Sequence, residues 1–133
     1  MTELAYSVFI VDDDFEDVFT LQKIFAETCP EVVLSHFNCG EDLLMHLEQG
    51  SDNNPDLILL DLNMPKMDGY QVLESLQKPQ WSKITVIVLT TSDRESDKDR
   101  SLTHGAALFQ TKLVKLDDLR KWSLDVKLML QER

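Results

Sequence analysis

Glycine, proline and cysteine are scarce in this sequence, with four, four and two residues among 133. So few glycines and prolines leave no room for a low-complexity linker or a repetitive, flexible segment. The two cysteines, Cys29 and Cys39, lack the paired spacing of a zinc site. We interpret both as reduced, partly buried thiols, in preference to a disulfide or a redox pair.

Long apolar runs and basic residues are also lacking. No apolar stretch approaches the length of a membrane span, and residues 1–4 lack the basic start of a signal peptide, so we expect a cytoplasmic protein with no membrane association. The 13 lysines and arginines are outnumbered by 24 aspartates and glutamates, which gives a net charge of -11. Direct binding to nucleic acid is therefore not expected.

What the chain does contain is a regular alternation of apolar and amphipathic segments. Strands are predicted near residues 6–11, 32–37, 56–61, 85–90 and 107–111, and helices near 15–29, 40–49, 69–77, 94–104 and 116–130. This alternation predicts an α/β fold: a doubly wound, five-stranded parallel sheet with helices on both faces. The matching flavodoxin-like strand order is 2-1-3-4-5. The length fits one domain spanning residues 1–133.

Acidic residues follow two of the predicted strands directly. The apolar run from Leu57 to Leu60 ends on Asp61, and the first strand runs into Asp12, Asp13 and Asp14. In the predicted order these two strands are neighbours, about 4.8 Å apart, so their acids come within reach of one ion. Carboxylate oxygens are hard ligands that suit Mg²⁺ better than zinc. The sequence thus predicts a divalent-cation site at this edge of the sheet.

Two further strands end on polar residues of other kinds. The fourth predicted strand ends at Thr90, and the fifth is followed by Lys112. Because the carboxyl ends of parallel strands share one edge of the sheet, acids, a hydroxyl and an ammonium converge there.

This constellation resembles the receiver domain of two-component response regulators, and the resemblance covers nearly the whole chain. It implies that Asp61 is the phosphoacceptor and that Mg²⁺ or Mn²⁺ is held by Asp12, Asp13, Asp61 and the main-chain carbonyl of Asn63. It further implies that phosphoryl binding and switching are carried out by Thr90, Lys112 and Phe109. The loop and the access to Asp61 are implied to be formed by Met64, Pro65, Gly69 and Thr91.

The resemblance also implies a function. Such a domain accepts a phosphoryl group from a histidine kinase or a phosphotransfer protein and signals by docking to a downstream protein, or by forming a homodimer through helices 4 and 5. It is not an enzyme beyond slow hydrolysis of its own phosphoryl group. No output domain is expected in the chain. The Thr90-Thr91-Ser92 stretch further resembles stand-alone regulators paired with bacterial phytochromes.

Three alternatives remain open. An aspartyl-nucleophile, Mg²⁺-dependent phosphohydrolase of the haloacid-dehalogenase-like kind needs a second acid two residues after the nucleophile, where Asn63 stands. A nucleotide- or flavin-binding domain needs a glycine-rich loop after the first strand, and no glycine lies there. The third alternative is a phosphorylation-impaired receiver that acts as a constitutive binding module.

The third alternative arises from departures from the family pattern. Leu113 stands where the family has a proline, so we predict a trans Lys112–Leu113 bond and a different aim for Lys112. Thr91 is larger than the residue usual there, which predicts narrower access to Asp61. Lys98 and Asp99 replace apolar residues of the fourth helix, which we therefore expect to be short, frayed or mobile.

Several acids have simpler interpretations than chemistry. Asp14 is suited to cap the first helix, and Glu16 and Asp17 are suited to its first turn, where negative charge is favourable. We prefer these helix-capping roles to metal ligation. Asp68 is likewise a candidate N-cap for the third helix.

Overall fold

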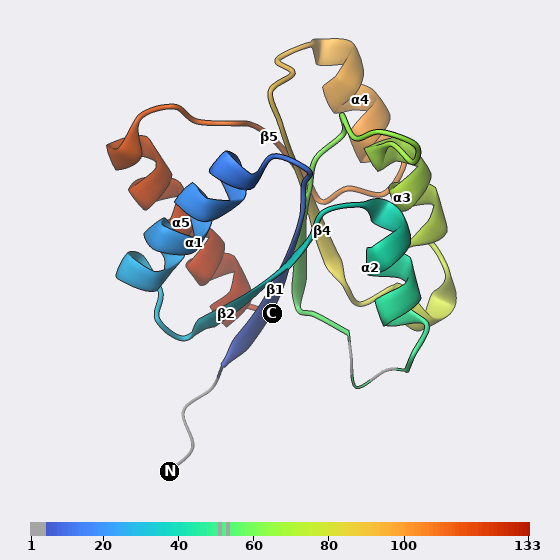
Figure 1. Ribbon diagram of the computed structural model, residues 1–133, viewed down its shortest axis with the longest axis horizontal. Coiled ribbons are helices and arrows are strands. Elements are labelled where there is room, and N and C mark those ends of the chain that lie inside the picture. The colour runs from blue at the N-terminus through green and yellow to red at the C-terminus, as the bar shows by residue number, and fades with distance from the viewer. Residues whose placement is uncertain (1–4, 51, 53) are drawn as a thin grey trace.

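Five parallel strands form one sheet at the centre of the protein (Figure 1). The computed structural model describes residues 5–50, 52 and 54–133. The strands are β1 (Tyr6–Val11), β2 (Val32–Phe37), β3 (Leu57–Leu60), β4 (Thr85–Thr90) and β5 (Leu108–Thr111). Their order is β2-β1-β3-β4-β5, which confirms the predicted order. The predicted third strand was one residue too long at each end, so Asp61 lies just beyond the strand.

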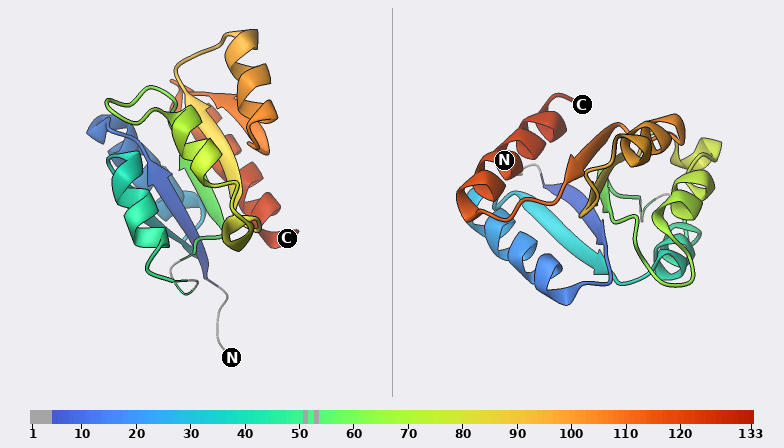
Figure 2. Two further views of the ribbon diagram at one scale, coloured as in Figure 1. Left: turned by 90° about the vertical axis from the view of Figure 1, so that its right-hand side faces the viewer. Right: turned by 90° about the horizontal axis from the view of Figure 1, so that it is seen from above.

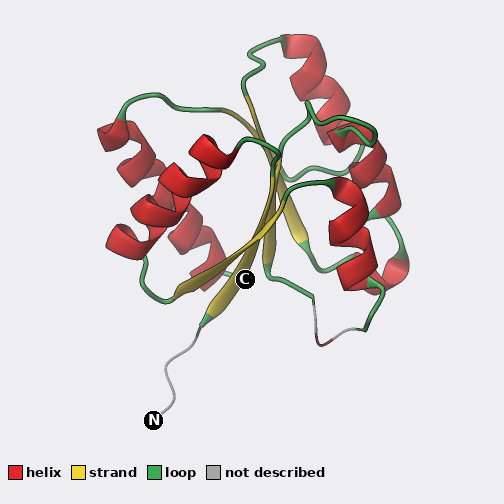
Figure 3. Cartoon of the chain, viewed as in Figure 1, coloured by secondary structure: helices red, strands yellow, loops and turns green. Residues whose placement is uncertain are grey.

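Helices cover both faces of the sheet (Figure 2). They are α1 (Phe15–Thr28), α2 (Gly40–Leu47), α3 (Gly69–Ser75), α4 (Glu95–Thr103) and α5 (Leu116–Gln131), with a short 3₁₀ helix, η2 (Pro79–Trp81), before β4. Helices α1 and α5 lie together on one face, and α2, α3 and α4 lie on the other (Figure 3). Each predicted helix is confirmed within two residues at its ends. Within the described part of the chain, no helix is long and apolar enough to cross a membrane.

The apolar core lies in two layers, one on each face of the sheet. Successive residues of β1 alternate between them: Phe9 and Val11 pack toward α2 and α3, whereas Val8 and Ile10 pack toward α1 and α5. All four residues of β3 are buried because helices cover both sides of this central strand. The sheet is therefore a rigid support, and its carboxyl edge is where polar side chains emerge.

Local capping interactions fix the helices that follow β1 and β3. Asp14 caps α1, as predicted, by accepting hydrogen bonds from the main-chain N–H groups of Glu16 and Asp17. Asp68 caps α3 in a reciprocal capping box with Gln71. A Cβ atom at Gly69 would lie 2.6 Å from the carbonyl oxygen of Asp61. Glycine is thus required for α3 to begin this close to the end of β3.

Helix α4 differs from its predicted description. It is a regular nine-residue helix although Ser101 is its only buried residue among those described. Its anchor is polar: the Tyr70 hydroxyl donates to Asp97 Oδ1 at 2.6 Å, and the Ser92 hydroxyl donates to Asp97 Oδ2 at 2.6 Å. The Arg100 guanidinium stacks 3.8 Å from the centre of the Tyr70 ring. The helix is shorter by one residue at each end than the predicted 94–104, whereas the expectation that it is frayed or mobile stays a prediction.

The hydrogen bonds to Asp97 also act on ionisation. The Ser92 and Tyr70 hydroxyls hold the pKa of Asp97 below its usual value, so this carboxyl stays charged near neutral pH. Burial and the hydrogen bond to Asp97 raise the pKa of Tyr70, which keeps its hydroxyl a donor. Asp97 therefore links α3, α4 and the loop after β4 through charge-assisted hydrogen bonds.

We predict that Asp97→Ala lowers the free energy of unfolding by about 1–3 kcal/mol, because it removes the carboxylate that accepts from the Tyr70 and Ser92 hydroxyls and leaves Tyr70 only the longer bond to the main-chain oxygen of residue 97, at 3.4 Å. Urea denaturation measures the change. Asp99→Ala is the matched control, since Asp99 is an exposed acid on the same helix and should change stability by less than about 0.5 kcal/mol. Equal effects of the two substitutions would contradict a specific anchoring role for Asp97.

Candidate functional site

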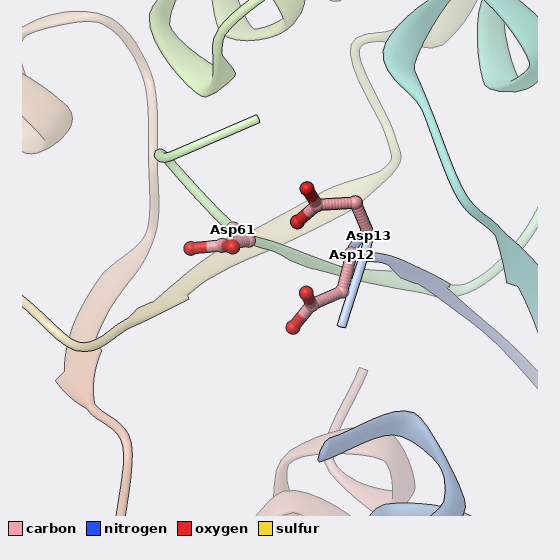
Figure 4. A group of neighbouring side chains, drawn as sticks. All are labelled: Asp12, Asp13 and Asp61. Carbon is pink, nitrogen blue, oxygen red and sulfur yellow. The ribbon is translucent and has the colours of Figure 1, made fainter. Parts of the chain in front are cut away.

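Three carboxylates meet beyond the ends of β1 and β3 (Figure 4). Asp12 and Asp13 directly follow β1, and Asp61 directly follows the neighbouring β3. One oxygen from each lies within 4.8 Å of the others. Asp12 and Asp61 are buried, with 2% and 6% of their surface exposed, whereas Asp13 faces solvent. The parallel register of two adjacent strands thus brings together acids that lie 48 residues apart in sequence.

The donor set fits a divalent cation that prefers oxygen ligands. Two buried carboxylates and one exposed carboxylate supply negative charge around one space, a combination suited to Mg²⁺ or Mn²⁺. The backbone of Asn63 lies against the same site, since its N–H donates to Asp61 Oδ1 at 3.4 Å. Ligation through the carbonyl of Asn63 stays a prediction.

Lys112 provides a positive charge within this acidic group. Its Nζ lies 2.9 Å from Asp12 Oδ2, 2.7 Å from Asp17 Oδ2 and 3.8 Å from Asp61 Oδ2. Its main-chain N–H donates to the carbonyl of Thr90 at 2.7 Å, which fixes where the side chain starts. The Lys112–Leu113 bond is trans, as predicted, and the side chain still reaches the acids.

Ionisation of Lys112 follows from these contacts. Burial alone favours the neutral amine, but the hydrogen bonds to Asp17 and Asp12, with the charges of Asp12 and Asp61, outweigh it. The pKa of Lys112 is therefore held above its usual value. The ammonium form persists throughout the physiological pH range.

Asp61 is the carboxyl that resists ionisation. Burial, followed by the negative charge of Asp12, raises the pKa of Asp61 to about 6. Lys112, the Asn63 N–H and the Thr90 hydroxyl act in the opposite direction without cancelling that effect. Placing a buried acid next to a second acid is unfavourable for folding. Such pairs, with their shifted pKa values, are therefore found mostly at functional sites.

The remaining predicted residues differ in how deeply they are buried. Thr90 is fully buried at the end of β4, and its hydroxyl accepts from the Ser92 N–H at 3.4 Å. Phe109 is half-buried and packs against the core layer under α2 and α3. Met64 is buried, whereas Pro65 is exposed.

Thr91 occupies a different position from Thr90. It is exposed, and it lines a cavity of about 490 Å³ that also borders Lys112 and lies toward α1 and α5. The narrower access predicted from its size stays a prediction.

Two contacts were not predicted from sequence. Asp17 was interpreted only as a first-turn acid, yet it makes the shortest contact to Lys112. Its position in the first turn of α1 has a sufficient local explanation, so the sequence carried no signal of this contact. His36 Nε2 lies 2.8 Å from the main-chain oxygen of Asp12, so it is a structural contact on β2. Cys29 and Cys39 are free thiols, as expected.

Comparison with known proteins agrees with this geometry. Residues 8–123 match the model of the response regulator receiver domain. The chain belongs to this family. Among curated proteins it is 35% identical over 119 residues to the response regulator Rcp1 of Synechocystis, covering 86% of this chain and 81% of Rcp1. Receiver domains are generally phosphoacceptors rather than enzymes, and they interact with histidine kinases or phosphotransfer proteins.

Solved receiver structures have the same fold. The phosphorylated cyanobacterial phytochrome response regulator RcpA superposes with a TM-score of 0.81 at 31% identity, covering 92% of this chain and 91% of RcpA. The Mn²⁺-bound form of Rcp1 gives a TM-score of 0.79 at 31% identity, with the same coverage of both chains. The narrower resemblance to phytochrome-linked regulators is thereby confirmed. The Mn²⁺ in that relative agrees with the donor set of this receiver.

We predict that Asp61→Asn stabilises the metal-free receiver at neutral pH. The native carboxyl binds its proton more tightly than the unfolded one, whose pKa is 3.8, so folding is penalised as pH rises through 4 to 6. The gain should be near zero below pH 4 and reach about 1–3 kcal/mol above pH 6. Urea denaturation in chelator at several pH values measures it.

The control for this prediction is Asp93→Asn, which removes an exposed acid from the loop before α4. It should leave stability unchanged within about 0.5 kcal/mol at every pH. A stability gain for Asp61→Asn that did not depend on pH would contradict the raised pKa as its cause.

Proposed function

We propose that this receiver accepts a phosphoryl group on Asp61 and signals through an altered docking surface. The observation that carries the proposal is the position of the Asp61 carboxylate. It is buried beside a second carboxylate, and the ammonium of Lys112 lies 3.8 Å away. A carboxylate in this setting can act as a nucleophile, and the ammonium of Lys112 partly balances its negative charge. The phosphorylated state of its relative RcpA supports the same role.

The chemistry is an in-line displacement at phosphorus. An Asp61 oxygen forms the new bond to phosphorus while the bond to the donor breaks, either to a histidine nitrogen of a kinase or phosphotransfer protein or to the oxygen of a small acyl phosphate. Asp61 reacts as the anion, so its raised pKa has to be offset by positive charge. Mg²⁺ held by Asp12, Asp13, Asp61 and the Asn63 carbonyl would neutralise the transferring oxygens. Lys112 would pair with one of them.

Thr90 is proposed to detect the new group. Its hydroxyl, already close enough to influence Asp61, would bond a phosphoryl oxygen, and Phe109 on the neighbouring strand would follow. That movement has a path to α4. The Ser92 N–H now donates to the Thr90 hydroxyl, and the Ser92 hydroxyl donates to Asp97 on α4. Phosphorylation would therefore change how α4 is held.

The surface that would carry the signal is formed by α4, β5 and α5. Five leucines on these elements are exposed although they are large and apolar: Leu102, Leu108, Leu116, Leu124 and Leu128. A downstream protein, or a second copy of the chain docking through α4 and α5, would cover them. The cytoplasm is the proposed compartment, because the proposed phosphoryl donors act there. Direct nucleic-acid binding remains unexpected at a net charge of -11.

The earlier alternatives gain no support from the site. Asn63 places an amide where a phosphohydrolase of the considered kind needs a second acid. Asp14 caps α1 directly after the acidic pair, where a nucleotide-binding domain needs a phosphate loop. Lys112 reaches the acids despite Leu113, so the altered loop gives no sign of an impaired site.

We predict that acetyl phosphate with Mg²⁺ adds one phosphoryl group to the native chain and none to Asp61→Asn. Intact-mass spectrometry counts the group, and hydroxylamine should remove it because an acyl phosphate is reactive toward nitrogen nucleophiles. Asp68→Asn is the control, since Asp68 is another loop acid that serves only as a helix cap. An adduct on both the native chain and Asp61→Asn would contradict the assignment. No adduct on the native chain would favour the phosphorylation-impaired receiver.

A further inference from the structure

Lys112 is held by one carboxylate that belongs to the cation site and by another that does not. Asp12 is part of the three-carboxylate group, whereas Asp17 lies outside it. Of the carboxylates within ion-pair distance of Lys112 in the described part of the chain, Asp17 alone has no share in that group. A bound cation would therefore compete with Lys112 for Asp12 but not for Asp17.

A divalent cation would weaken the hold of Asp12 on Lys112. Bound by Asp12, Asp13 and Asp61, it would draw on the same carboxylate that Lys112 now contacts at 2.9 Å, and it would repel the ammonium directly. The Lys112 side chain is 14% exposed and borders the cavity of about 490 Å³ that lies toward α1 and α5, so this cavity is the space into which it would move away from the acids. Asp17, at 2.7 Å, is the partner that remains available.

The loop after Lys112 offers little restraint of its own. The Lys112 backbone is fixed by its hydrogen bond to Thr90, but Val114 is 94% exposed. Only Leu113 packs against the core layer under α1 and α5. The direction of the lysine side chain is therefore set mainly by what its ammonium contacts.

Asp17 is itself well fixed. It lies in the first turn of α1, and its main-chain N–H donates to the cap Asp14 at 3.2 Å. That cap directly follows the acidic pair, so the start of α1 is joined to the cation site with no intervening loop. A carboxylate anchored in this way can hold an ammonium in a defined place at little entropic cost.

We propose that Asp17 is a positioning residue that keeps the Lys112 ammonium beside Asp61 while a divalent cation occupies the three carboxylates. This role rests on the proposed phosphoacceptor function. Asp17 touches neither the cation nor the phosphoryl group. It acts through Lys112, which it keeps ready to pair with a transferring oxygen.

The first test is the rate of phosphorylation by acetyl phosphate at saturating Mg²⁺, followed by intact mass. Asp17→Asn should lower the rate by about three- to tenfold, the range expected when a charge-assisted contact to a reacting group is lost. Asp17→Glu keeps the carboxylate and should restore at least half of the native rate. Glu16→Gln, which removes the neighbouring exposed acid of the same turn, should leave the rate unchanged.

The second test needs neither cation nor phosphoryl donor. In chelator, urea denaturation of Asp17→Asn, Lys112→Met and the double variant forms a double-mutant cycle. The two substitutions should be non-additive by about fivefold or more in the unfolding equilibrium constant. Glu16→Gln combined with Lys112→Met should be additive, because Glu16 has no contact with Lys112.

Each outcome decides the proposal. A native rate in Asp17→Asn, or an equal loss in Glu16→Gln, would overturn the role of Asp17 and leave the phosphoacceptor function intact. A loss of rate without coupling to Lys112 would also overturn it, because Asp17 would then act by another route. If the native chain takes no phosphoryl group, the proposed function fails, and this role fails with it.

Discussion

Mutual repulsion of carboxylates is the constraint on which the site depends. The parallel sheet forces Asp12 and Asp61 together at the ends of adjacent strands, where both are buried. Two acids this close are stable only if one is protonated or if positive charge lies between them. Both effects leave their mark here: the pKa of Asp61 is raised to about 6, and the ammonium of Lys112 lies within ion-pair distance of both acids. The negative charge of these carboxylates is therefore only partly offset by Lys112. A bound divalent cation or an added phosphoryl group would change that balance.

The same constraint bears on how the site would transmit a signal in the proposed function. Around the acids the sheet is rigid, with β3 buried on both faces, so a change of charge cannot be absorbed there. The side chains that can rearrange are those joined by hydrogen bonds next to the sheet. From Thr90 the bonds run through Ser92 to Asp97, and from Asp97 to Tyr70 on α3. Helix α4 lacks an apolar stripe and is held by these bonds, so in the proposed function a shift at Thr90 would act on it directly.

Much of the site was predictable because it follows from topology. Once the sequence indicated a parallel sheet, the residues after the first and third strands had to lie side by side, and Asp12, Asp13 and Asp61 were identified on that ground. Thr90 and Lys112 followed from the ends of the next two strands. Asp17 was missed because a first-turn acid has a sufficient local explanation. Nothing in the sequence says that its side chain meets a lysine 95 residues further along the chain.

The sequence by itself determined the strand order, the helix positions within two residues, the acidic edge and the trans bond before Leu113. These features rest on periodicity, capping and backbone chemistry, which are local properties. The tertiary structure alone decided that α4 is a regular helix anchored through Asp97, and that Asp17 shares Lys112 with Asp12. Both depend on polar side chains from distant segments meeting at hydrogen-bond distance, and such pairings leave no periodic signal in the sequence.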